Sequence, residues 1–280
     1  SASPARPGPR PPQPAPRTGP GWYAPDAGPA PAQGKGGGMP RAAETPMAVT
    51  IEYLGHSGFL IHAEVPKGDF KVLIDPYLTD NPVATHKPGE IVCTHICVTH
   101  GHFDHLGDTA AISRSNAAKV YANFEICEEL ADLAGPTEGM NTGGRVDTEF
   151  GFVALTQAFH SSSFQGKYMG MPCGVVLRFE GAGEGGKDLT VYHAGDTDLF
   201  SDMKLIGEIY QPDIAMLPIG DRFTMGPELA AKAAELIKPK VAIPIHHGTW
   251  PPITVDVSRF KPNGIEVKVM KPADVWELPL

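Results

Sequence analysis

The sequence predicts an α/β protein in which β-sheets stack face to face and helices cover the outside. Short apolar segments rich in β-branched residues recur along both halves of the chain, which is typical of strands. Each half also carries segments with helical spacing. The clearest helix opens at Pro227 and ends before Pro239. Strand-rich halves that each carry helices favour stacked sheets with outer helices.

Strands and helices of the first half follow from apolar content and spacing. Strands are expected at residues 49–54, 58–65 and 70–74, and within residues 90–98, a segment that leads to Thr99. Helical spacing is present in residues 108–117 and 124–133.

The second half repeats this alternation. Strands are expected at residues 152–157, 174–179, 189–192, 214–217, 241–245, 267–269 and 275–278. Helices are expected at residues 202–209 and 227–237.

Residues 1–48 differ from the rest of the chain and are dominated by Pro, Gly and Ala. Such a stretch cannot bury enough apolar surface to offset the entropy lost on ordering, so we expect a disordered extension. Its scattered arginines and low acidity leave open an organelle-targeting or partner-binding arm. One folded domain is expected over residues 49–280.

The composition excludes several classes of protein. Hydrophobic residues make up 41% of the 280 residues, as in globular proteins, and the net charge of -9 disfavours a general nucleic-acid binder. The four cysteines form no C-x-x-C pair, so neither a zinc ribbon nor a disulfide framework is indicated. No apolar run is long enough to span a bilayer and no secretory signal is visible, so a cytoplasmic protein is expected.

The strongest functional signal is T-H-G-H-F-D-H-L-G at residues 99–107, directly after an apolar strand. Imidazole suits zinc, iron and nickel, and a carboxylate adds a harder oxygen donor. His100 and His102 can face one metal, and Asp104 and His105 can turn toward a second. Because unpaired polar groups lose their hydration on burial, so dense a cluster is costly to bury without metal.

Three later residues extend this ligand set. His160, Asp196 and His246 each follow an apolar strand, where a rigid element gives way to a loop. Taken with the first cluster they supply five histidines and two aspartates. This set is large enough for two metals with open positions for water.

The order of these ligands resembles the metallo-β-lactamase superfamily. The chain is more similar still to one branch, the poorly characterised metal-dependent hydrolases of bacteria and archaea. That similarity rests on L-G-H-S-G-F-L-I at residues 54–61, D-P at residues 75–76 and F-T-M-G-P at residues 223–227. It covers essentially all of residues 49–280.

This resemblance implies a four-layer αββα sandwich with the metals in a cleft between the two sheets. Carried over residue by residue, it assigns His100, His102 and His160 to one metal, Asp104, His105 and His246 to the other, and Asp196 to both. We expect two divalent ions, in the first place Zn²⁺, with Mn²⁺, Fe²⁺ or Ni²⁺ as alternatives.

Two residues outside the ligand set have open roles. Asp75 either orients a ligand histidine or is a turn residue before Pro76. His56 either reaches the cleft, where it can contact substrate or transfer a proton, or is structural. We take His56, Asp104 and Asp196 as the candidate catalytic residues.

The expected function is hydrolysis of an ester, amide, lactone or phosphodiester in a small molecule by a metal-bound hydroxide. One alternative is an RNA- or DNA-cleaving phosphodiesterase, which the acidic net charge disfavours. Another is a metal-binding sensor or scaffold without turnover. A diiron oxygen or nitric oxide reductase is disfavoured, because such proteins carry a glutamate where His102 stands. No membrane association is expected, and a homo-oligomer is compatible with the sequence.

Overall fold

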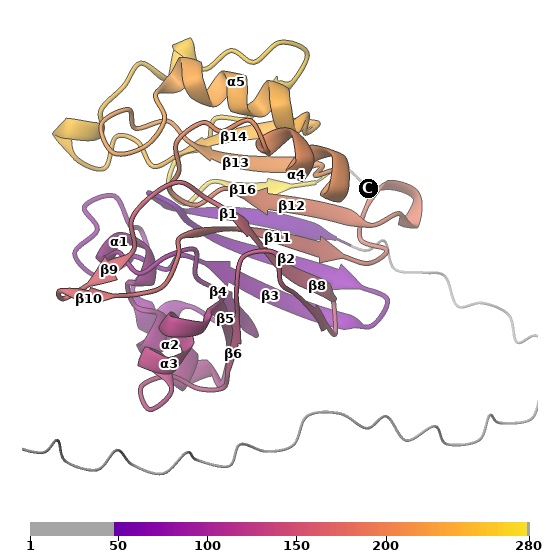
Figure 1. Cartoon of the computed structure of the whole chain (residues 1–280). Helices are drawn as coiled ribbons and strands as arrows, with labels where there is room; N and C mark the ends of the chain where they lie inside the picture. Colours follow the sequence, from indigo (N-terminus) through magenta and orange to yellow (C-terminus); the bar gives the residue numbers. More distant parts are fainter. Residues whose placement is uncertain (1–47, 279–280) are drawn as a thin grey trace, which may run out of the picture. The chain divides into compact units, whose positions relative to one another are not determined.

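The computed structural model describes residues 48–278. The extension expected over residues 1–48 lies, apart from its last residue, outside this range. Within the described residues, two seven-stranded sheets form the body of the protein (Figure 1).

The first sheet is built mainly from the first half of the chain. In spatial order its strands are β16 (Val275–Glu277), β1 (Val49–Gly55), β2 (Gly58–Val65), β3 (Gly68–Ile74), β4 (His95–Cys97), β5 (Lys119–Asn123) and β6 (Thr137–Met140). The C-terminal strand β16 pairs with β1, so the two ends of the described chain meet at one edge of this sheet.

The second sheet is built from the second half. In spatial order its strands are β15 (Glu266–Val267), β14 (Val241–Ile245), β13 (Ile214–Pro218), β12 (Leu189–His193), β11 (Cys173–Phe179), β8 (Gly151–Gln157) and β7 (Arg145–Thr148). A small hairpin of β9 (Ser163–Phe164) and β10 (Lys167–Tyr168) lies outside both sheets.

Helices occupy the loops between strands. The α-helices are α1 (Phe103–Leu106), α2 (Thr109–Asn116), α3 (Phe124–Leu130), α4 (Met203–Tyr210) and α5 (Pro227–Ile237). Short 3-10 turns are η1 (Pro88–Glu90), η2 (Glu184–Gly186), η3 (Pro251–Ile253) and η4 (Val257–Arg259). None of the helices within residues 48–278 is long and apolar enough to cross a membrane.

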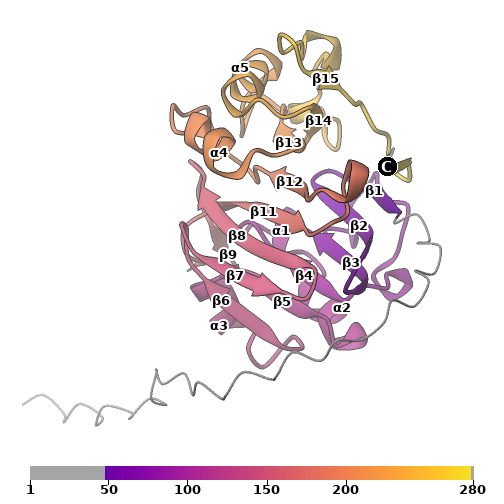
Figure 2. The same cartoon turned by 90° about the vertical axis from the view of Figure 1, so that its right-hand side faces the viewer.

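Three apolar clusters define four layers. Side chains of β1 and β2, such as Ile51 and Phe59, pack against Val175 and Leu177 of β11 in a core between the two sheets. Since neighbouring residues of a strand point to opposite faces, Val176 instead faces the cluster that contains α4 and α5. A third cluster packs α2 and α3 on the outer face of the first sheet. The α2–α3 and α4–α5 pairs therefore lie on opposite sides of the two sheets (Figures 1 and 2). The predicted αββα sandwich is confirmed.

The structure corrects several predicted elements. The strand expected within residues 90–98 is only β4, and strands β5, β6 and β7 were not predicted. Central strand β5 is buried along most of its length, so its sequence lacks the alternation of a half-exposed strand. Strands β6 and β7 are edge strands of four residues each and are partly exposed, so they carry too short an apolar pattern to be recognised from the sequence.

The strand directions gather particular loops at one end of each sheet. Strand β3 runs parallel to β4, and β12, β13 and β14 run parallel to one another. The loops that follow parallel strands lie at the same edge of a sheet, where α/β proteins commonly bind ligands. Most of the predicted functional residues follow β3, β4, β12 and β14, whereas His160 follows β8 and His56 follows β1.

Candidate metal centre

The structure brings all seven predicted ligands into one cluster. His100 and His102 follow β4, and Asp104 and His105 lie on the single turn of α1. The remaining three follow β8, β12 and β14 and are His160, Asp196 and His246. Both sheets therefore contribute to the cluster, as expected for a cleft between them.

The ligand atoms form overlapping groups. One group holds His100, His102 and His160, and a second holds Asp104, His105 and His246 together with His56. A third group of His100, His105 and Asp196 overlaps both. Within each group the candidate donor atoms all lie within 4.8 Å of one another. This grouping agrees with the two ligand sets that the resemblance implies. Metal binding by these residues remains a prediction.

Asp196 lies between the two groups. Its Oδ2 atom is 3.6 Å from Nε2 of His160 and 2.9 Å from Nε2 of His246, and its Oδ1 atom is 3.3 Å from Nε2 of His105. The carboxylate therefore touches residues from both groups. This position is the one that a bridging ligand needs.

Asp75 contacts His105, which favours the orienting role over that of a turn residue. His105 Nδ1 donates a hydrogen bond to Asp75 Oδ2 at 2.7 Å. Asp75 is held in turn by the backbone amide of Thr99 at 2.8 Å and the hydroxyl of Thr99 at 2.7 Å. Because one ring proton is held on Nδ1, Nε2 is the nitrogen of His105 left for metal, which is how a carboxylate prepares a histidine ligand.

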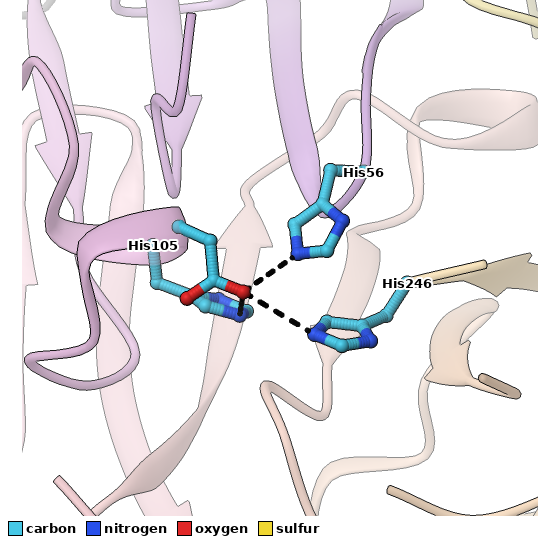
Figure 3. A group of neighbouring side chains, drawn as sticks. His56, His105 and His246 are labelled. Atoms are coloured by element: carbon cyan, nitrogen blue, oxygen red, sulfur yellow. Dashed lines mark hydrogen bonds and ion pairs between the residues drawn. The ribbon is translucent and has the colours of Figure 1, made fainter. Parts of the chain in front are cut away.

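His56 lies beside the cluster in the turn between β1 and β2 (Figure 3). Figure 3 shows His56, His105 and His246 around one carboxylate group. The Oδ2 atom of Asp104 is 3.0 Å from Nε2 of His56, 4.0 Å from Nε2 of His105 and 3.6 Å from Nε2 of His246. His56 Nε2 donates to Asp104, and Nδ1 accepts from the hydroxyl of Thr249 at 2.8 Å. Burial lowers the pKa of His56 to about 4, so the ring is neutral. His56 is fully buried and does not line the cavity at the site, contrary to the expectation that it reaches the cleft.

The histidines of the cluster fall into two groups according to the direction in which their pKa is shifted. Burial lowers the pKa of His100, His102 and His160, so these rings are neutral and ready to bind metal. Burial also acts to lower the pKa of His246 and His105. For these two rings the neighbouring Asp196 carboxylate outweighs burial, raising the pKa of His246 to about 9 and that of His105 well above its usual value.

The same contacts keep the two carboxylates ionised. Burial acts to raise the pKa of Asp196 and of Asp104. For Asp196 the charges of His246 and His105 outweigh burial, and for Asp104 the His246 and His56 rings do so. In the metal-free protein two protonated histidines thus balance two carboxylates, and a metal cation would take the place of those protons.

The buried polar atoms fit a metal. Among residues 48–278, the ring nitrogens of His246, Nε2 of His105 and Oδ1 of Asp196 are fully buried and have no well-aligned hydrogen-bond partner. Nε2 of His105 and of His246 lie near the Asp196 carboxylate, but attraction between charges without aligned hydrogen bonds only partly offsets the hydration that these buried atoms lose. A metal cation supplies the missing partner, so the residues fit the divalent ions that the sequence predicts.

A cavity of about 510 Å³ opens onto this cluster. Its floor includes His102, Asp104, His160, Asp196 and His246, and its walls are Phe103, Ser161, Phe223, Trp250 and Pro252. No role was expected from the sequence for Phe103, Trp250 or Pro252. Their only sequence signal is closeness to predicted ligands, one to six residues away.

Comparisons with known proteins agree with this fold and site. Residues 71–247 match the family model of the beta-lactamase superfamily domain. A UPF0173 metal-dependent hydrolase of Carboxydothermus hydrogenoformans is 46% identical over 232 residues, covering 80% of this chain and 98% of the relative. One of Thermococcus kodakarensis is 42% identical over 236 residues, covering 82% of this chain and 100% of the relative.

A solved structure is similar over most of the chain. Igni18, a metallo hydrolase of the archaeon Ignicoccus hospitalis KIN4/I, superposes with a TM-score of 0.72 at 35% identity, covering 83% of this chain and 99% of Igni18. The similarity of sequence and of fold spans the domain that carries the histidine and aspartate cluster. The chain therefore belongs to the metallo-β-lactamase superfamily and, within it, to the UPF0173 metal-dependent hydrolases.

Proposed function

We propose that the protein is a hydrolase that uses two divalent metal ions, in the first place Zn²⁺, to cleave an ester, amide, lactone or phosphodiester bond in a small molecule. His100, His102 and His160 would hold one ion, and Asp104, His105 and His246 the other. Asp196, which touches both groups, would bridge them. The names of the relatives as metal-dependent hydrolases support this proposal.

The observation that carries the proposal is the state of His105. Its Nδ1 proton is committed to Asp75, and its Nε2 atom is buried without a hydrogen bond among the described residues, 3.3 Å from Asp196. A histidine fixed in this way is costly in a purely structural role, because the inward nitrogen is near the charge of Asp196 but has no aligned hydrogen bond. In a metal site the same arrangement makes the ring a better ligand.

Bound divalent ions acidify a water molecule and polarise the substrate oxygen. The protein's own residues position these reactants. Asp196 and Asp104 are ionised and buried at the floor of the cavity, where they can hold the water in line with the substrate. His56 acts on the reaction through Asp104, because its Nε2 hydrogen bond fixes the orientation of that carboxylate. In this proposal His56 is a positioning residue, whereas Asp104 and Asp196 are catalytic.

Elemental analysis of protein purified without chelator tests the metal assignment. We expect about two equivalents of divalent metal per chain. Asp196→Ala should lose both ions and all measurable hydrolysis, because one carboxylate serves both groups, whereas His160→Ala should weaken mainly one ion. A folded Asp196→Ala variant that retains two tightly bound ions would exclude the bridging role. A folded wild-type protein that takes up no zinc or manganese would exclude the metal centre.

A substrate screen distinguishes the proposed hydrolase from a nuclease and from a metal-binding sensor or scaffold. A metal-loaded protein that hydrolyses no ester, amide, lactone or phosphodiester would be a sensor or scaffold without turnover. Cleavage of RNA or DNA as the fastest reaction would identify the phosphodiesterase. Among the described residues no Lys or Arg lines the cavity, which disfavours binding of a polyanion there.

A further inference from the structure

The walls of the cavity suggest which substrates it accepts. Three aromatic side chains from separate segments line it: Phe103 on α1, Phe223 in the loop between β13 and α5, and Trp250 after β14. Phe103 and Phe223 are 57% and 55% exposed. Exposed apolar surface grouped at the mouth of a polar site marks a place where a ligand removes that surface from water.

The aromatic wall is organised rather than incidental. The rings of Phe103 and Trp250 have centroids 6.0 Å apart, and each also packs against Tyr77, at 5.7 and 6.0 Å. Trp250 further contacts His56, with centroids 5.0 Å apart. These contacts hold the indole and the phenyl ring in place before any ligand arrives. A preformed apolar wall binds an apolar group without first losing side-chain entropy.

Outside the proposed metal centre, no charged side chain of the described residues lines the cavity. Apart from the histidines and aspartates of the proposed metal centre, Ser161 is the only polar residue among the described residues that line the cavity. Arg222 stands over the Phe223 ring at 5.7 Å but does not line the cavity. A carboxylate or phosphate on the non-reacting part of a substrate would therefore meet aromatic rings in place of the Arg or Lys partners that bind such groups.

We propose that the substrates are uncharged carboxylic esters, lactones or amides that carry an apolar group, which packs on the wall of Phe103, Phe223 and Trp250. This inference rests on the proposed hydrolase function and narrows its substrate class. In the reaction the oxygen of water bonds to the carbonyl carbon, and the bond from that carbon to the leaving oxygen or nitrogen breaks. The leaving atom takes up a proton, so the products are a carboxylic acid and an alcohol or amine.

A series of p-nitrophenyl esters tests this substrate class on the zinc-loaded full chain. We expect kcat/KM to rise from acetate through butyrate to hexanoate by about fourfold per added methylene while the chain remains on the wall. The p-nitrophenyl monoester of adipic acid matches hexanoate in length but ends in a carboxylate. It should be hydrolysed at least tenfold more slowly than hexanoate, because its charge gains no partner on the wall.

Variants of Phe223 test whether the aromatic wall causes the preference for longer acyl chains. Phe223 suits this test because its ring lies on a loop away from the ligand motif. Phe223→Ala should lower the ratio of kcat/KM for hexanoate to that for acetate by roughly fivefold or more, mainly through KM, with unchanged metal content. Phe223→Leu should restore most of the ratio. The matched control is Phe124→Ala, which removes an equally exposed phenylalanine, 55% exposed, that does not line the cavity. This control should leave the ratio unchanged.

The outcomes of these assays distinguish the proposed substrate class from the proposed hydrolase function. Equal rates for acetate and hexanoate, or faster hydrolysis of the adipate monoester, would overturn the apolar substrate class while the hydrolase proposal stands. Cleavage of bis-p-nitrophenyl phosphate without cleavage of any ester would do the same. Absence of turnover on every substrate by a protein with two bound ions would overturn the hydrolase function itself.

Discussion

At the scale of single residues, Asp75 links the fold to the proposed chemistry. It follows β3 with a backbone φ of 45°, and its carboxylate binds Thr99 and His105. Asp75→Asn keeps the size of the side chain but removes its charge, so it weakens the hydrogen bond that fixes the His105 ring. We expect metal affinity to fall about 10- to 100-fold. Competition with a zinc chelator measures this affinity.

The control for Asp75→Asn is Asp132→Asn, which changes an exposed aspartate remote from the cluster. This variant should bind zinc as the wild type does. If a folded Asp75→Asn protein bound zinc as tightly as the wild type, Asp75 would serve only as a turn residue.

His193 illustrates a buried histidine with a structural role. Its Nε2 donates to the carbonyl of Ser57 at 2.9 Å, and its Nδ1 accepts from the amide of Gly195 at 3.1 Å, so only the neutral ring satisfies both contacts. Burial lowers its pKa. As pH falls below about 6.5, the unfolded chain takes up a proton that the folded chain does not, and stability is lost until the folded pKa is reached.

We expect metal-free His193→Gln to be less stable than metal-free wild type by about 1–3 kcal/mol at pH 8, because one buried contact is lost. The difference between the two proteins should narrow as pH falls from 7 toward 5, since only the wild type carries the titrating ring. Urea unfolding at each pH measures it. A difference independent of pH would mean that His193 has an ordinary pKa.

At the scale of elements, the single turn of α1 positions two proposed ligands, and Gly107 ends it. Gly107 has φ of 38°, and a Cβ atom there would lie 2.4 Å from the carbonyl oxygen of Pro76. An alanine must therefore push α1 away from the loop after β3. We expect Gly107→Ala to lower stability by about 2 kcal/mol or more and to reduce bound metal.

Gly89→Ala provides the matched control, because a Cβ atom at Gly89 would meet no other atom within 4 Å and the backbone φ there is not positive. Thermal unfolding and elemental analysis of both variants measure the two effects. If Gly107→Ala kept full metal content and wild-type stability, α1 would not depend on its close approach to the β3 loop.

At the scale of the whole molecule, the proposed metal centre joins the two sheets. His100 and Asp104 come from loops of the first sheet, whereas His160, Asp196 and His246 come from loops of the second. Ions bound there would stabilise the folded state over the unfolded one by about 4 kcal/mol each at a free concentration of 1,000 times Kd. We therefore expect chelation to lower Tm by about 8 °C or more.

Calorimetry with and without chelator, followed by added zinc, measures this change. The lost stability should return with zinc, and Asp196→Ala should show little response to either treatment. An unchanged Tm in a wild-type protein proven to have lost its metal would mean that the sheets are held together without the ions.

The sequence by itself determined the layered fold and the positions of the seven proposed ligands. Strands such as residues 58–65 are visible because their patterns are local, and the ligands stand out because imidazole and carboxylate are rare together after apolar strands. Edge strands β6 and β7 escaped prediction, since each is only four residues long and partly exposed, which leaves little apolar pattern to detect.

Only the tertiary structure decided how residues far apart in sequence meet. It directs Asp75 to His105, 30 residues away, and His56 to Thr249, 193 residues away. It also gathers Phe103, Phe223 and Trp250 into one wall. The physical reason is that side-chain direction and long-range contact depend on how the sheets pack, which no local pattern encodes.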